Sequence, residues 1–119
     1  MSWVKTAVPR ALLFTMALGT TVLGATAVSA QEPTRIPITI ENNRFVPSEV
    51  KVKAGTPFVL VVTNKDAKSE EFESKDLRIE KVIPGGKTAN IRVRALKPGT
   101  YPFFGEFNPK SAQGQIVAE

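Results

Sequence analysis

Cysteine and histidine are absent from the 119-residue chain, and its two methionines and single tryptophan all lie within the first sixteen residues. From residue 17 onward there is therefore no sulfur and no imidazole. This excludes disulfides and metal sites built from thiolate, thioether or imidazole ligands in that part of the chain. Nucleophilic or general-base catalysis near neutral pH also lacks its usual side chains. We therefore expect that the chain is not an enzyme.

The first thirty residues have the composition of a secretory signal peptide. Lys5 and Arg10 precede an uncharged, largely apolar run over residues 11–28, and Ala27-Val28-Ser29-Ala30 supplies small residues at its end. This order is typical of a signal that is removed on export. We expect cleavage after Ala30, a periplasmic product and no membrane span after cleavage. The alternative is a retained anchor, because the apolar run approaches spanning length.

Residues 31–119 are then expected to form one domain of 89 residues, since 119 − 30 = 89. Without Lys5 and Arg10, its formal charge is 14 − 11 = +3. The basic residues alternate along expected strands, as at Lys51 and Lys53, and do not gather with aromatic residues. We interpret them as solvent-facing positions that discourage edge pairing. An anionic surface is the alternative partner, and we expect no nucleic acid.

Apolar residues recur with a period of two along most of this domain. Ile36 to Ile40 and Ala89 to Ala95 alternate with polar residues, whereas Phe58 to Val62 is apolar on both faces. Turns such as Pro84-Gly85-Gly86 and Pro98-Gly99 separate these segments. The pattern predicts an all-β fold, an antiparallel Greek-key β-sandwich or barrel of seven or eight strands, with Phe58 to Val62 as a central strand.

The order of these segments resembles the cupredoxin fold. The resemblance is carried by Phe45-Val46-Pro47, residues 50–55, Asn64-Lys65-Asp66, Pro98-Gly99-Thr100-Tyr101 and residues 114–117. Residues 70–74, 81–86 and 103–107 further resemble small cupredoxin-like proteins associated with bacterial iron uptake. That resemblance implies a periplasmic accessory of metal uptake. Its implied partner is an iron permease or a periplasmic iron-binding protein.

The resemblance also indicates where a blue-copper protein would hold its metal. The first histidine position falls on Glu70, the cysteine position on Gly105 and the second histidine position on Asn108. Residues 111–113, before the last strand, offer no axial methionine. A type 1 copper centre needs a thiolate and two imidazoles. We therefore expect no such centre.

Oxygen donors at these positions suggest a different kind of metal site. Carboxylate and amide oxygens suit hard cations such as ferric iron, manganese, calcium or magnesium. We predict a metal site made of Glu70, Glu106 and Asn108. Glu71 and Glu73 are lesser candidates, because alternation along a strand prevents all of these acids from facing one site. The cofactor stays open, with an iron or copper ion as candidates, and the alternative is a solvated, ligand-free loop end.

The aromatic residues near the C-terminus have structural explanations. Alternation places Phe103 and one neighbour in the core, leaving the other neighbour and Phe107 at the loop end; an exposed recognition patch is the alternative. The Tyr101 hydroxyl is expected to tie a corner of the fold rather than bind iron as a phenolate.

Three functions stay open on these grounds. The first is an exported cupredoxin-like accessory of metal (iron) uptake, which binds metal through oxygen ligands or docks to the uptake machinery. The second is a copper-type electron-transfer or ferrous-oxidising cupredoxin. The third is a metal-free periplasmic interaction domain.

Overall fold

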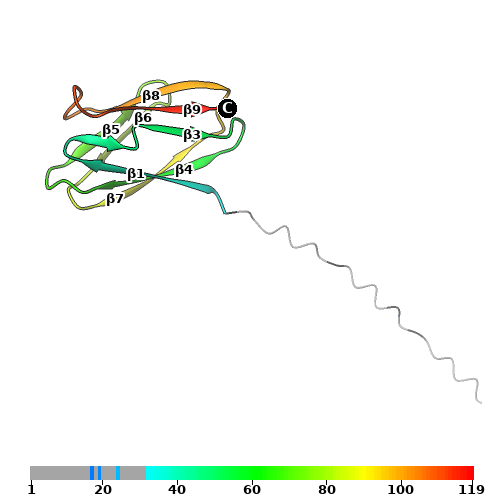
Figure 1. Ribbon diagram of the computed structural model, residues 1–119. Helices are drawn as coiled ribbons and strands as arrows, with labels where there is room; N and C mark the ends of the chain where they lie inside the picture. The colour runs from blue at the N-terminus through cyan, green and yellow to red at the C-terminus, as the bar shows by residue number, and fades with distance from the viewer. Residues whose placement is uncertain (1–16, 18, 20–23, 25–31) are drawn as a thin grey trace, which may run out of the picture. The chain divides into compact units, whose positions relative to one another are not determined.

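Two β-sheets pack face to face in the computed structural model of the protein (Figure 1). The structure describes residues 32–119, together with Ala17, Gly19 and Gly24. Most of the expected signal peptide therefore lies outside the described residues. Within the described part of the chain, no helix is long and apolar enough to cross a membrane.

Four strands form the first sheet and five form the second. In spatial order, the four-stranded sheet contains β2 (Arg44–Val46), β1 (Thr34–Glu41), β4 (Phe58–Asn64) and β7 (Thr88–Val93). The five-stranded sheet contains β3 (Glu49–Val52), β9 (Gln113–Ala118), β8 (Gly99–Gly105), β5 (Glu70–Ser74) and β6 (Ile79–Ile83).

The predicted all-β sandwich is confirmed, with differences in strand number and direction. The described residues form nine strands, because the short return after the Asn42-Asn43 turn pairs with β1 as a strand of its own, β2. Two pairs are parallel, β1 with β4 and β3 with β9. Periodicity reveals which residues face inward but not the direction of the partner strand, so the sequence could not distinguish these pairs.

The core lies between the inner faces of the two sheets. Phe58, Leu60 and Val62 of β4 are buried, as expected for a central strand. Across the interior, the ring centroid of Phe72 lies 5.7 Å from that of Phe45 and 4.8 Å from that of Phe103. This cluster joins β2 to β5 and β8, and such aromatic contacts add to the free energy gained from burial. Packing therefore holds the sheets together without a disulfide.

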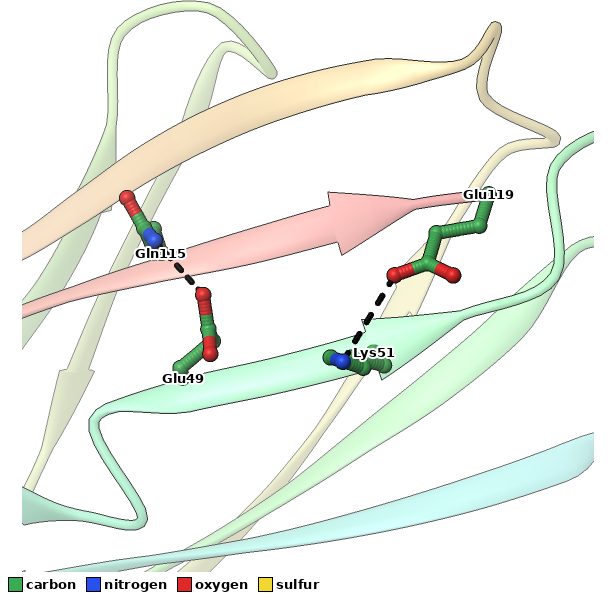
Figure 2. A network of polar contacts seen from close by, with 4 residues as sticks. All are labelled: Glu49, Lys51, Gln115 and Glu119. Carbon is green, nitrogen blue, oxygen red and sulfur yellow. Dashed lines mark hydrogen bonds and ion pairs between the residues drawn. The ribbon is translucent and has the colours of Figure 1, made fainter.

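Polar side chains line the exposed face at the β3 edge of the five-stranded sheet. Figure 2 shows Gln115 Nε2 donating to Glu49 Oε1 at 2.7 Å and Lys51 Nζ lying 3.7 Å from Glu119 Oε1. Both partners of the ion pair are well exposed, so it contributes little to stability. Charged residues on an edge strand instead discourage pairing with another chain, as the sequence suggested.

Candidate functional site

Glu70 is an acidic side chain in the interior, at the first position of β5, with 2% of its surface exposed. Its Oε1 accepts hydrogen bonds from the backbone N–H groups of Glu71 and Phe107, both at 2.9 Å. Its Oε2 accepts a 2.8 Å hydrogen bond from Asn108 Nδ2. All three partners are donors, which suits the acceptor-only oxygens of an ionised carboxylate. Glu70 therefore joins β5 to the loop that follows β8.

That loop, residues 105–112, is closed by its own backbone. The Gly105 N–H donates to the Ala112 carbonyl at 2.8 Å, and the Ala112 N–H donates to the Asn108 carbonyl at 2.8 Å. Ser111 Oγ donates to the Asn43 carbonyl at 2.7 Å and so fastens the loop to the β1–β2 turn. These bonds hold Asn108 and the Phe107 N–H in place toward Glu70.

Gly105 leaves the space that the Glu70 carboxyl group fills. A Cβ atom at position 105 would lie 2.6 Å from Glu70 Cδ and 2.7 Å from Ala112 Cβ. Both separations are shorter than ordinary van der Waals contact. A side chain at position 105 and the carboxylate of Glu70 in its present place therefore exclude each other.

A second buried polar residue, Asn64, fixes the neighbouring loop at the end of β4. Its Nδ2 donates to the Lys68 carbonyl at 2.8 Å and to the Ile83 carbonyl at 2.9 Å. Asp66 then accepts the backbone N–H groups of Asn42 and Asn43 at 2.8 and 2.9 Å. Among the described residues, every buried side-chain nitrogen and oxygen has a hydrogen-bond partner. The buried polar side chains at this end of the sandwich are therefore all hydrogen-bonded, which fixes the loops there.

Comparison with known proteins agrees with this architecture. The model of the family "Cupredoxin-like domain" matches residues 12–118. The chain belongs to this family. The resemblance that the sequence suggested is confirmed at the level of the domain.

One relative and several solved structures are similar to this cupredoxin-like domain. "Uncharacterized protein RP394" of Rickettsia prowazekii (strain Madrid E) is 43% identical over 82 residues, which cover 69% of this chain and 66% of that protein. The match thus spans slightly less than two thirds of the relative's length.

The similar structures share the fold at low sequence identity. Auracyanin A, a "blue" copper protein from Chloroflexus aurantiacus, has a TM-score of 0.64 at 16% identity, covering 74% of this chain and 100% of its own. The metal-binding domain of the Cu(I)-exporting P-type ATPase CopA of Streptococcus pneumoniae D39 has a TM-score of 0.61 at 16% identity, covering 71% and 84%. Amicyanin from Paracoccus versutus has a TM-score of 0.58 at 16% identity, covering 74% and 92%.

The structure brings together two of the three residues predicted to bind metal. Glu70 and Asn108 are hydrogen-bonded to each other, whereas Glu106 is exposed and its negative charge acts on Glu73. Glu106 therefore belongs to a different group from the other two. The metal assignment itself stays a prediction.

Glu71 and Glu73 lie on the outer face of β5, opposite the inner face that carries Glu70. The β5–β6 register sets Glu73 directly across from Glu80, which the sequence analysis did not single out. One carboxylate oxygen from each of Glu71, Glu73 and Glu80 lies within 4.8 Å of the others. Strand alternation alone could not reveal this group, because it depends on the pairing of two strands.

Like charges and partial burial act on Glu73 within this outer acidic group. Burial raises the pKa of Glu73 above its ordinary value, and the neighbouring Glu106 carboxyl group raises it further. The negative charges of Glu106, Glu80 and Glu71 act in the same direction. The folded protein therefore holds a proton on Glu73 more tightly than the unfolded chain does.

The aromatic residues of this region are divided between core and surface. Phe103 is buried, Phe104 is half-buried with Lys75 Nζ 5.9 Å from its ring centroid, and Phe107 is 51% exposed at the loop end. The Tyr101 hydroxyl donates to the Lys97 carbonyl at 2.8 Å, the corner contact that the sequence predicted. Phe107 is thus the exposed aromatic side chain of the loop that Glu70 holds.

Proposed function

We propose that the protein is an exported, periplasmic, non-enzymatic accessory of metal uptake, with iron as the transported metal, and that it acts by docking to the uptake machinery. One observation carries the proposal. The buried carboxylate of Glu70 holds the loop 105–112 through two hydrogen bonds of 2.8–2.9 Å, from the Phe107 N–H and from Asn108 Nδ2, and also accepts the N–H of Glu71 on β5. These internal contacts support a docking role for the end of the domain that carries the loop 105–112.

The positions that the cupredoxin resemblance assigns to copper ligands support this mode of action. Glu70 and Asn108 bind each other, and Gly105 supplies no side chain. A metal ion with ligands from β5 and from the loop would fasten the two together. The carboxylate of Glu70 supplies the same link by accepting from the Phe107 backbone and the Asn108 side chain. We infer that this domain keeps the cupredoxin scaffold and replaces the type 1 copper centre with an internal hydrogen-bonded cluster.

A copper-type electron-transfer or ferrous-oxidising role would require a thiolate and imidazoles to hold the copper, and residues 17–119 contain neither cysteine nor histidine. The purified protein, mixed with Cu(II), should show no intense thiolate-to-copper absorption band in the visible region. A band of that kind would overturn the inference. N-terminal sequencing of the exported protein tests the expected cleavage, and a mature chain beginning at Gln31 would support it.

Docking is tested directly by binding measurements with the iron permease and with the periplasmic iron-binding protein of the same cell. The exported protein is presented in a chelating buffer and again with ferric iron. The proposal predicts saturable binding to one of the two partners. The affinity should be the same in the chelating buffer as with ferric iron. Phe107→Ser should weaken it, whereas Val82→Ser, at a similarly exposed apolar residue on β6, should not. Binding to neither partner, or only with metal present, would contradict the docking role.

Metal binding through oxygen ligands stays a prediction beside this proposal. Titration with iron, copper and manganese distinguishes the two groups of acids. Glu70→Ala combined with Glu106→Ala removes both carboxylates of the predicted metal site. Glu73→Gln combined with Glu80→Gln neutralises two carboxylates of the outer acidic group only. Equal metal binding by the wild type and the first double variant would reject the predicted site at Glu70, Glu106 and Asn108.

A further inference from the structure

A hollow of about 500 Å³ lies on the exposed face of the four-stranded sheet, where β1 and β4 begin and β7 ends. These strand ends lie at the end of the sandwich opposite the loop 105–112 (Figure 1). Its lining is partly apolar, from Pro33, Pro57 and Val59, and partly polar, from Arg35, Asn90 and Arg92. The hollow shares no residue with the Glu70 cluster.

The register of three neighbouring strands produces this arrangement. Arg35 of β1 pairs with Val59 of β4, which in turn pairs with Arg92 of β7, so an arginine flanks Val59 on each side. Arg35 Nη2 donates to Asn90 Oδ1 at 3.1 Å, which directs its guanidinium group across β4 toward β7. Asn90 and Arg92 are two residues apart and share a sheet face. Both arginines therefore line the hollow over the same part of the sheet.

These two positive charges have no carboxylate partner in the part of the chain that the structure describes. The ion pair found there joins Lys51 to Glu119, at the β3 edge of the other sheet. Two neighbouring guanidinium groups repel each other, and a bound anion removes that repulsion. The planar fork of arginine matches the oxygens of a carboxylate or a phosphate. Val59 is only 7% exposed although it points outward, so the floor between the arginines is apolar and sheltered.

We propose that this hollow is a binding site for a small organic anion, with an oxyanion held between Arg35 and Arg92 and an apolar body resting on Pro33, Pro57 and Val59. Its volume falls within the range of about 300–1,000 Å³ that small-molecule sites occupy. The combination of an apolar floor with a few polar groups at one side is also typical of such sites. The site goes beyond the docking function and does not depend on it.

Amide NMR spectra of the exported protein, recorded during titration, test the proposal. The probes are 4-phenylbutyrate, phenyl phosphate and inorganic phosphate. The two aromatic anions should shift the amide signals of Val59, Asn90 and Arg92 and compete for one site. Inorganic phosphate, which has no apolar body, should bind about tenfold more weakly. The tighter of the two aromatic probes identifies the natural oxyanion as carboxylate or phosphate.

Charge variants distinguish a built site from general attraction to a basic protein. Arg35→Gln combined with Arg92→Gln should weaken binding at least about tenfold, because each arginine contributes a charge-assisted hydrogen bond. Arg92→Lys keeps the positive charge but loses the planar guanidinium group. Its affinity for the anion should lie between that of the double variant and that of the wild type. Lys81→Gln combined with Lys110→Gln removes the same charge from exposed positions outside the hollow and should leave the affinity within about twofold.

Three results would overturn the proposal. The first is an equal loss of affinity in the two double variants. The second is a set of shifted signals spread over the whole surface, and the third is the absence of saturable binding by either aromatic probe.

Discussion

Asn108 Nδ2 donates a 2.8 Å hydrogen bond to Glu70 Oε2, across 38 residues of sequence. With the backbone donors of Glu71 and Phe107, it completes a buried acceptor site that joins β5 to the loop 105–112. Ala112 is the one hydrophobic residue of the loop that is buried like the residues of the core, and it is the last residue of the loop. Its position therefore depends strongly on these polar contacts.

Removing the Glu70 carboxyl group should destabilise the fold far more than neutralising it. Glu70→Ala leaves three partly buried hydrogen bonds without their acceptor and should lower the free energy of unfolding by about 3–5 kcal/mol. Glu70→Gln should cost about 1–2 kcal/mol. A glutamine oxygen can still accept from the two backbone N–H groups, and the Asn108 amide can rotate to accept from the glutamine N–H. Urea unfolding measures both values, and equal losses would contradict this role of Glu70.

Gly105→Ala should destabilise the protein by about 1–3 kcal/mol, because the new methyl group would meet Glu70 Cδ and Ala112 Cβ at less than contact distance. The same substitution should cost less in a Glu70→Ala background, where one of the two contacts is gone. Unfolding of the single and double variants measures the coupling. Identical costs of Gly105→Ala in both backgrounds would show that the glutamate does not occupy this space.

Neutralising Glu73 should stabilise the protein at neutral pH. The pKa of Glu73 is raised in the folded state, so the folded protein binds this proton more tightly than the unfolded chain does. The contribution of Glu73 to stability is therefore present at low pH and is lost as the pH rises through its folded pKa. Glu73→Gln should melt about 1–3 °C higher than the wild type at pH 7. The difference should shrink as the pH falls below about 4, because the wild-type carboxyl group becomes protonated in both the folded and the unfolded states.

Thermal melting as a function of pH checks this expectation. Glu49→Gln, on the β3 edge and away from the outer acidic group, is the matched control and should not show the same pH dependence. A difference between Glu73→Gln and the wild type that stays constant from pH 4 to pH 7 would contradict the assignment.

Local sequence patterns were sufficient to predict the inner and outer faces of the strands. Ile38 of β1 and Ile91 of β7 follow from alternation with polar residues, whereas the continuous apolar run from Phe58 to Val62 indicates only that β4 is a central strand. Periodicity does not specify strand direction, so the parallel pairing of β1 with β4 required the three-dimensional structure. The assignment to the cupredoxin-like domain family was nevertheless accessible, because that resemblance depends on the order of turns and strands.

The candidate site was only partly predictable because its contacts are distant in sequence. The sequence placed Glu70 and Asn108 together correctly by resemblance, but it could not show that they bind each other. The direction of Glu106 depends on the turn that follows Gly105, which carries this side chain to Glu73 on the outer face. Glu80 enters the acidic group through the register of β5 with β6. Each of these facts is a property of strand pairing or loop closure and not of local composition.

Exchanging the donor and acceptor roles of Glu70 and Asn108 tests the central claim most directly. Asn108→Asp alone places two carboxylates in hydrogen-bond contact inside the protein and should cost about 3–5 kcal/mol at neutral pH. Glu70→Gln combined with Asn108→Asp again places a hydrogen-bond donor opposite an acceptor. The protein then has the same net charge as the wild type. Unfolding free energies of the four proteins, measured in a chelating buffer, give the coupling between the two residues. We predict that the double variant returns to within about 1–2 kcal/mol of the wild type. Additive losses from the two substitutions would show that Glu70 and Asn108 do not form the hydrogen-bonded centre described above.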